Sequence, residues 1–252
     1  QQSGKILMVG FQSRYEPALV AAKKFADSGF LGKPYYAEAV GMGVETGRRR
    51  GLPGSPTFIS RTLAGGGVTL DIGVYPLDSS LNILNHPVPV SVNAVTAGYL
   101  GHDEAASKVA GAWVWDPAKF EVEDFSAAFI RFEDDLVMVY KQAWAMHAES
   151  LGNPLVLGTK GGISVSDGVP VFYTDVNGYM VNITPQHLPR VDAFRQKIVD
   201  FVEAVRGNKQ SPIDPKGIVA MHYIIDAIYQ SAEIKKEVSV NLPPALRRTK
   251  WT

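Results

Sequence analysis

An aspartate and a tyrosine stand four residues apart, shortly after three consecutive glycines, and they are the pair best suited to acid–base chemistry in this sequence. The glycines at 65–67 let the backbone turn tightly and approach a neighbouring element closely, and apolar residues from Leu70 to Leu81 recur at helical spacing. We therefore expect a helix to begin after the glycines. Residues four apart share one face of a helix, so the Asp71 carboxylate and the Tyr75 hydroxyl could act on one small molecule.

Pro76 complicates this simple helix. It has no N–H to donate to the Ile72 carbonyl, and it biases Tyr75 away from helical dihedral angles. We therefore expect a kink or an irregular turn near Tyr75. The alternative to a functional pair is a helix start that carries an incidental carboxylate and tyrosine.

Composition excludes several classes of function. The 252 residues include 25 Lys plus Arg and 25 Asp plus Glu, so no net field favours nucleic acid or an anionic membrane. The absence of cysteine excludes disulfides, thiolate metal sites and a cysteine nucleophile, and it fits a reducing, cytoplasmic compartment. The five histidines are scattered without metal-binding spacing, and no apolar run approaches the roughly 20 residues of a membrane helix. We expect no metal site, no nucleic-acid partner and no membrane partner.

The N-terminal end predicts an interrupted domain. Residues 6–11 form a continuous apolar run, which is typical of a strand buried on both faces of a parallel sheet. Nothing before this run could supply neighbouring strands. We therefore expect the sequence to begin inside a domain whose earlier part is absent. Residues 17–28 then predict a helix with Pro17 in its first turn, and residues 35–40 predict a strand.

The glycines of residues 41–47 imitate a dinucleotide-binding fingerprint. A Rossmann loop must open directly into a helix, whereas Arg48, Arg49 and Arg50 are followed here by glycines and prolines. We therefore reject this stretch as a cofactor site. Residues 41–60 instead predict a long loop and a candidate lid, whose arginines either meet an anionic substrate or a cofactor phosphate or are solvated.

The second half of the sequence predicts an α+β fold with a mainly antiparallel open sheet. Its short apolar segments are separated by turn residues, and two amphipathic helices follow, at 191–205 and from Pro215. We expect the helices to pack on one face of the sheet and the other face to be free for a partner subunit. The predicted strands are 88–96, 125–132, 136–144, 154–158, 161–165, 169–174 and 179–183.

Four stretches carry a resemblance to a known family: residues 63–78, residues 9–17, the Val-Glu-Asp-Phe at 122–125 and the Gly-Thr-Lys-Gly-Gly at 158–162. Together they resemble the glucose–fructose oxidoreductase, inositol dehydrogenase and rhizopine-catabolism oxidoreductase family. The tyrosine at position 75 is similar to the glucose–fructose oxidoreductase and dihydrodiol dehydrogenase branch. We interpret Glu123 and Asp124 as structural groups at a strand start rather than as catalytic ones.

The resemblance implies a domain division. Residues 1–16 would be the last strand of a dinucleotide-binding (Rossmann) domain that is otherwise absent. Residues 17–240 would form the substrate-binding and oligomerisation domain, and residues 241–252 a C-terminal tail. The full-length enzyme would use NAD or NADP, which this chain alone would not bind because it lacks the phosphate-binding loop.

The resemblance also implies a function. The chain would be the C-terminal half of an NAD(P)-dependent oxidoreductase that acts on a sugar, polyol or related compound by hydride transfer and forms a homo-oligomer through the open sheet face. Tyr75 would donate or accept the proton, Asp71 would orient the substrate hydroxyl, and Gln12 and Arg14 would contact the cofactor. The alternatives are a non-catalytic ligand-binding or assembly module and an NAD-dependent glycosidase.

Overall fold

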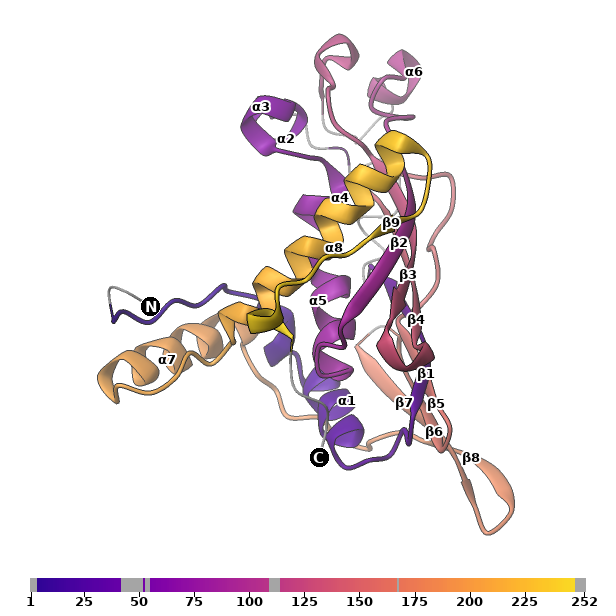
Figure 1. Ribbon diagram of the computed structural model, residues 1–252, viewed down its shortest axis with the longest axis vertical. Coiled ribbons are helices and arrows are strands. Elements are labelled where there is room, and N and C mark those ends of the chain that lie inside the picture. Colours follow the sequence, from indigo (N-terminus) through magenta and orange to yellow (C-terminus); the bar gives the residue numbers. More distant parts are fainter. Residues whose placement is uncertain (1–3, 42–51, 53–54, 109–113, 167, 248–252) are drawn as a thin grey trace.

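The computed structural model describes residues 4–41, 52, 55–108, 114–166 and 168–247, and within them one nine-stranded sheet runs through the molecule (Figure 1). The strands lie in the order β8-β7-β6-β5-β1-β4-β3-β2-β9. Their bounds are β1 (Pro34–Val40), β2 (Pro89–Ala97), β3 (Phe125–Phe132), β4 (Val137–Ala143), β5 (Leu155–Gly158), β6 (Gly161–Ser166), β7 (Val169–Val176), β8 (Tyr179–Ile183) and β9 (Val238–Ser239).

Neighbouring strands are antiparallel with one exception, because β1 pairs with β4 in parallel at the centre of the sheet. The predicted α+β class and the mainly antiparallel sheet are confirmed. The strands β3 and β4 pair across residues 133–135, with Phe129 opposite Val139.

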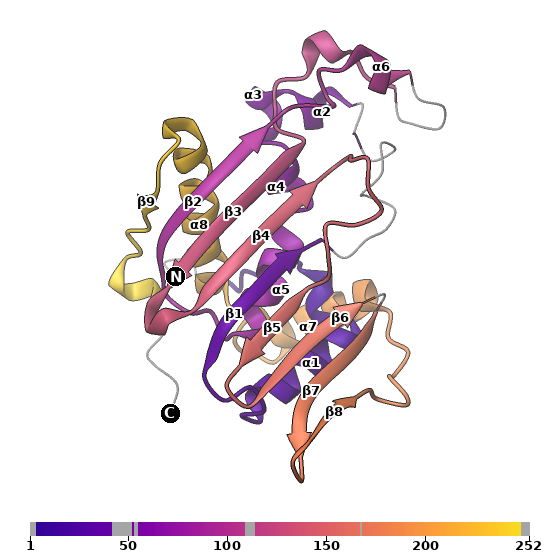
Figure 2. The ribbon, with the colours of Figure 1, turned by 90° about the vertical axis from the view of Figure 1, so that its right-hand side faces the viewer.

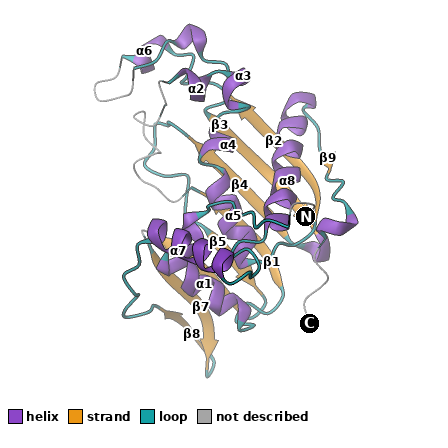
Figure 3. Ribbon diagram, turned by 90° about the vertical axis from the view of Figure 1, so that its left-hand side faces the viewer, coloured by secondary structure: helices purple, strands orange, loops and turns teal. Residues whose placement is uncertain are grey.

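Of the eight α-helices in the described residues, four are single turns and four have ten residues or more. Their bounds are α1 (Pro17–Asp27), α2 (Pro56–Ile59), α3 (Arg61–Ala64), α4 (Val68–Asp71), α5 (Val74–Ile83), α6 (Glu104–Ser107), α7 (Ala193–Arg206) and α8 (Pro215–Ile234). Figure 2 shows the strands uncovered towards the viewer, and Figure 3 shows α1, α5 and α8 in front of the sheet. The prediction that helices pack on one face is confirmed.

The core lies between this helical layer and the sheet. Residues on β3 alternate between buried and more exposed, as expected for a sheet with one covered face. Ile130 and Met138 are fully buried beneath the helices, in the same hydrophobic cluster as Met221 and Ile225 of the amphipathic helix α8. On the uncovered face, Phe129 remains 37% exposed. The hydrophobic pattern of the strands therefore determines which face the helices cover.

The prediction of a buried strand at residues 6–11 is wrong in this structure. Residues 4–11 have no regular secondary structure, and Leu7 and Val9 are 65% and 38% exposed. A strand needs a neighbour for its backbone hydrogen bonds, and none of the described strands lies beside this segment. Figure 1 shows the segment projecting from the body of the molecule near α7. At its end only Phe11 is buried, against the core.

The long loop predicted at 41–60 is only partly described. Residues 42–47 of the glycine-rich stretch, together with Arg48, Arg49 and Arg50, lie outside the described residues. The loop prediction is wrong at Pro56–Ile59, which form the single turn α2 because Ser55 caps it and proline can occupy its first position. In the described part of the chain, no helix combines the length and the apolar character needed to cross a membrane.

Candidate active site

Three glycines bring the chain into α4 at a point where no side chain fits. Gly65 has a φ of +80°, which favours glycine. A Cβ on Gly66 would lie 2.1 Å from the Tyr229 hydroxyl, and a Cβ on Gly67 would lie 1.9 Å from the Glu123 carbonyl oxygen. The predicted tight turn and close approach are therefore confirmed, and the partners are α8 and the segment that precedes β3.

The side chain of Glu123 holds the N-terminus of α4. Its carboxylate accepts hydrogen bonds from the backbone N–H of Gly67 at 2.9 Å and of Thr69 at 3.1 Å, and from the Tyr229 hydroxyl at 2.8 Å. An anion stabilises a helix at this end, where N–H groups lack intrahelical partners. Burial and the nearby Glu123 charge raise the pKa of Tyr229, which stays a neutral donor. The structural role predicted for Glu123 is confirmed.

The chain breaks between the two predicted site residues. Asp71 ends α4, Ile72 and Gly73 form a turn, and α5 begins at Val74. Pro76 lies in the first turn of α5, where a missing N–H is tolerated. The predicted irregularity is confirmed, and Asp71 and Tyr75 consequently stand on two consecutive helices rather than on one face of a single helix.

Asp71 is half-buried and has an unexpected partner. The indole N–H of Trp144, at the end of β4, donates to its Oδ2 at 2.8 Å. Burial raises the pKa of the Asp71 carboxyl, and the Trp144 hydrogen bond opposes that rise. The carboxylate is thus more basic than an exposed one, which makes it a better hydrogen-bond acceptor.

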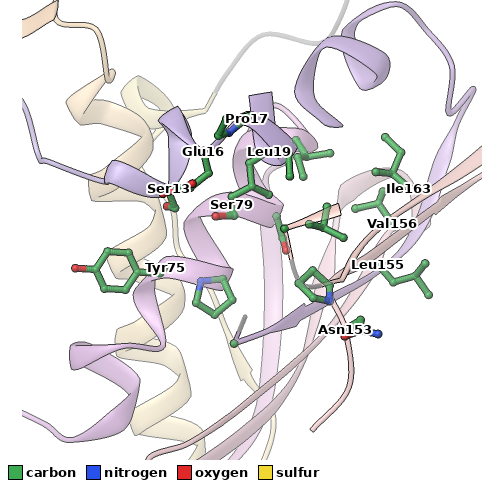
Figure 4. Close-up of a pocket in the computed structure, with 18 of the residues that line it drawn as sticks. Ser13, Glu16, Pro17, Leu19, Tyr75, Ser79, Asn153, Leu155, Val156 and Ile163 are labelled. Carbon is green, nitrogen blue, oxygen red and sulfur yellow. The ribbon is translucent and has the colours of Figure 1, made fainter. Parts of the chain in front are cut away.

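Tyr75 is half-buried at the start of α5, and its ring meets the edge of Phe11 with the centroids 5.7 Å apart. It lines one end of a cavity of about 710 Å³. In Figure 4 the Tyr75 hydroxyl points away from Val156 and Ile163, which lie towards the other end of the cavity. The hydroxyl is therefore directed away from this cavity, and the ring forms part of its wall.

The cavity brings two of the four predicted site residues together, since Gln12 lines it as well as Tyr75. Asp71 and Arg14 are not among its lining residues. Its volume lies in the range of small-molecule sites, and its walls combine aliphatic side chains of the core with polar groups such as Ser79 and Asn153.

Arg14 makes contacts that the sequence did not predict. Its Nε donates to Asp78 Oδ2 at 2.8 Å and its Nη2 donates to Asp78 Oδ1 at 2.6 Å, while Nη2 also lies 3.3 Å from His86 Nε2. The Asp78 side chain is fully buried and the Arg14 side chain is 12% exposed. Burial raises the pKa of the Asp78 carboxyl, and Arg14 opposes this rise. The pair ties the short helix Gln12–Tyr15 to α5, one helical turn beyond Tyr75.

A model of the GFO/IDH/MocA C-terminal domain matches residues 19–164, which is more than half of the chain. The chain belongs to the GFO/IDH/MocA family. The matched region contains Asp71, Tyr75 and Trp144, whereas Gln12 and Arg14 precede it. The family membership expected from the sequence is therefore confirmed.

Two curated GFO/IDH/MocA-like relatives align with nearly the whole chain. D-glucoside 3-dehydrogenase from Escherichia coli (strain K12) is 26% identical over 239 residues, which is 94% of this chain and 65% of the relative. Inositol 2-dehydrogenase from Rhizobium meliloti (strain 1021) is 26% identical over 241 residues, which is 93% of this chain and 65% of the relative. The chain thus spans just under two thirds of the length of these relatives.

Solved structures share the fold of this GFO/IDH/MocA chain. Aldose-aldose oxidoreductase from Caulobacter crescentus, complexed with glycerol, superposes with a TM-score of 0.72 at 22% identity, over 94% of this chain and 65% of that one. Levoglucosan dehydrogenase in complex with NADH superposes with a TM-score of 0.75 at 18% identity, over 95% and 67%. At these identities the likeness establishes the architecture.

Sequence reasoning missed the residues that support the site in this family member. Asp78 lies at the end of residues 63–78, which carry the family resemblance, but its partner Arg14 is 64 positions away in the sequence. No pattern of spacing links these two residues. Trp144 ended a predicted strand, and a tryptophan there is typical of a core. The described residues contain no cluster of three or more metal-binding side chains.

Proposed function

We propose that this chain is the substrate-binding part of an NAD(P)-dependent oxidoreductase that acts on a hydroxyl or carbonyl group of a sugar, polyol or related compound. Membership of the GFO/IDH/MocA family supports this proposal, and so do the dehydrogenase names of its relatives. The structural observation that carries it is the pair of half-buried groups, Asp71 and Tyr75, at the junction of two helices whose approach is fixed by Glu123 and the glycines.

In the proposed reaction, each group has a separate role. When an alcohol is oxidised, its carbon loses a hydride, which a bound nicotinamide accepts, and its oxygen loses a proton. The Tyr75 hydroxyl, which points away from the core-lined cavity, takes up or relays that proton and returns it in the reverse direction. The Asp71 carboxylate accepts a hydrogen bond from a substrate hydroxyl and so orients the ring. A charged acceptor makes a stronger hydrogen bond than a neutral one.

One candidate site for the pyrophosphate of NAD or NADP is already taken by a side chain. The obvious candidate, the glycine-rich entry to α4, has its N–H groups taken by Glu123, whose negative charge also repels a phosphate. We therefore propose that the cofactor is held mainly by a part of the protein outside this chain. Gln12, beside Tyr75 at the cavity, is the residue of this chain proposed to contact it, whereas the bonds of Arg14 to Asp78 favour a supporting role for Arg14.

The experiment that tests this function uses the enzyme with its nucleotide-binding domain attached. Tyr75→Phe keeps the ring and its contact with Phe11 but removes the proton-carrying hydroxyl. Since general acid–base groups contribute about 10²–10⁴-fold in rate, kcat is expected to fall by roughly that factor while the Kd for the cofactor hardly changes. Near-full turnover by this variant would make Tyr75 a packing residue and would refute the proposed mechanism.

We also propose that the chain forms a homo-oligomer through the uncovered face of the sheet (Figure 2). Val95 on β2, Phe129 on β3 and Tyr173 on β7 are 47%, 37% and 39% exposed, and the strand register places them on the face opposite the buried residues. Val139, opposite Phe129 on β4, and the ion pair between Lys141 and Glu38 lie among them. An apolar face with a few paired charges is suited to a second copy of the same surface.

A further inference from the structure

We infer that Trp144 is a positioning residue for Asp71: its indole N–H fixes carboxylate oxygen Oδ2 and thereby leaves Oδ1 to accept a hydrogen bond from a substrate hydroxyl. This inference rests on the proposed role of Asp71 and adds the residue that controls it. The supporting contact is the 2.8 Å hydrogen bond from Trp144 Nε1 to Asp71 Oδ2. Within the described part of the chain, it is the one side-chain hydrogen bond recorded for this carboxylate.

Trp144 is held rigidly enough to set the direction of another side chain. It is 2% exposed, and its ring meets Phe120 edge-on, with the centroids 6.3 Å apart and an interplanar angle of 86°. Its backbone N–H donates to the Asp124 carbonyl at 2.9 Å. These contacts belong to a second, smaller hydrophobic cluster that lies apart from the main core and includes Val68 of α4. An indole fixed in this way has a single direction for its N–H.

Both ends of the Trp144–Asp71 bond are fixed to the same short segment, residues 122–124. The carboxylate and the carbonyl of Glu123 hold the start of α4, and the Val68 N–H donates to that carbonyl at 3.0 Å. The neighbouring Asp124 holds the backbone of Trp144. A helix that carries the acceptor and a strand end that carries the donor are therefore placed relative to each other by adjacent residues. Such convergence is expected where the geometry of a functional group has to be fixed.

The neutral donor explains why a tryptophan suits this position. A lysine or arginine beside Asp71 would neutralise the carboxylate and depress its pKa, whereas an indole N–H orients one oxygen and leaves the charge in place. Burial raises the pKa of Asp71 and the hydrogen bond of Trp144 lowers it. The carboxylate is therefore oriented without losing its strength as an acceptor for a sugar hydroxyl.

Trp144→Phe tests this inference, with Trp115→Phe as the matched control. Trp115 belongs to the same cluster, is 5% exposed, and also donates its indole N–H at 2.8 Å, but to the Gly101 carbonyl. Both variants therefore lose one indole hydrogen bond and some ring volume. The Asp71 carboxyl is titrated by ¹³C NMR in this chain. Its pKa is expected to rise in Trp144→Phe and to stay unchanged in Trp115→Phe. An unchanged Asp71 pKa in a folded Trp144→Phe chain would overturn the inference.

A second variant keeps the test decisive if Trp144→Phe does not fold. Asp71→Ala leaves both tryptophans in place, and the ¹⁵N–¹H indole resonance of Trp144 is expected to shift upfield because its acceptor is lost, while that of Trp115 stays. If the Trp144 indole resonance does not move, Asp71 is not its partner and the inference fails.

Activity separates a positioning role from a purely structural one. The enzyme with its nucleotide-binding domain is assayed with NAD and with NADP on D-glucose, methyl α-D-glucoside, levoglucosan and inositol. For a substrate that is oxidised, Trp144→Phe is expected to raise KM about tenfold, which corresponds to roughly 1.4 kcal/mol of lost binding free energy. The value of kcat is expected to stay nearly unchanged. Equal KM values in the Trp144 and Trp115 variants would contradict positioning. If none of the compounds is oxidised, the proposed function loses support, while the two NMR measurements still decide the contact.

Discussion

Replacing Arg14 by methionine tests whether this residue supports the site rather than contacting a cofactor. The substitution keeps much of the aliphatic stem but removes both hydrogen bonds to Asp78, whose side chain is fully buried. Removing one member of a buried ion pair typically destabilises a protein by about 3–5 kcal/mol, because the remaining charge has no counter-ion and no water. That is a large part of the roughly 5–15 kcal/mol that stabilises a typical domain.

Two further variants separate the pair from its individual members. Arg14→Lys retains the positive charge but can replace only one of the two hydrogen bonds to Asp78. We therefore expect a smaller loss of stability, of about 1–3 kcal/mol, from the hydrogen bond that lysine does not make. The double variant Arg14→Met/Asp78→Leu removes both charges and fills the space with apolar atoms. It is expected to recover most of the lost stability, because replacing a whole buried pair is often neutral or stabilising.

The effect of Arg14→Met also depends on pH in a defined direction. Burial raises the pKa of Asp78 above its unfolded value, and loss of Arg14 removes the groups that oppose this rise. A carboxyl with a raised folded-state pKa contributes stability that is fully present below its unfolded pKa, near 4, and is lost as pH rises through the folded value. Arg14→Met has a lower free energy of unfolding than the parent chain at neutral pH, and this difference is therefore expected to shrink as the pH is lowered.

Urea unfolding followed by tryptophan fluorescence measures these differences, with Lys33→Met as the control. Lys33 forms an ion pair with Asp135 at 3.4 Å, but both side chains are mostly exposed, so its loss should hardly change the unfolding midpoint. If Arg14→Met has the same unfolding midpoint as the Lys33→Met control, the supporting role is refuted. It is also refuted if the double variant loses as much stability as the Arg14→Met and Asp78→Leu changes added together. A large loss of cofactor affinity without a stability change would restore the cofactor contact implied by family resemblance.

Four other outcomes are expected. Gly67→Ala should greatly reduce the yield of folded protein, because its Cβ would lie 1.9 Å from the Glu123 carbonyl oxygen. Gly29→Ala has open space around its Cβ and should lower the Tm only modestly, and circular dichroism compares the two variants. Asp71→Asn should raise the Tm at pH 8 more than at pH 4, because folding disfavours the ionised form of a carboxyl whose pKa is raised in the folded chain. The same variant should bind the substrate more weakly. Calorimetry on this chain alone should show no micromolar NAD or NADP binding. Light scattering should show an oligomer that Phe129→Glu dissociates.

The regular elements could be predicted from the sequence because their signals are local. Proline at the first position of a helix, period-two alternation in strands and glycine or asparagine in turns each act over a few residues. The segment 125–132 was predicted with the bounds of β3, and the helix starting at Pro17 with the start of α1. The local conflict at Pro76 was also visible in the sequence, and it corresponds to the break before α5.

Elements whose structure depends on distant partners were not predicted. Residues 6–11 have the composition of a buried strand, but a strand forms only where another strand is available to pair with it. The Arg14–Asp78 and Trp144–Asp71 contacts join positions 64 and 73 residues apart, and no spacing rule reaches that far. Family resemblance identified which residues could form a site, but the residues that position them were found only from the folded contacts.

The geometry of the site follows from how the two hydrophobic clusters meet. Asp71 lies on α4, which contacts the smaller cluster through Val68 and the main core through Leu70, whereas Tyr75 on α5 packs against the main core. The two helices meet at Gly73, where a Cβ would lie 1.9 Å from the hydroxyl oxygen of Tyr140, a fully buried residue of the main core. Only a hydrogen atom fits between Gly73 and the Tyr140 hydroxyl, and this close approach fixes the backbone between the residues that carry the carboxylate and the Tyr75 hydroxyl.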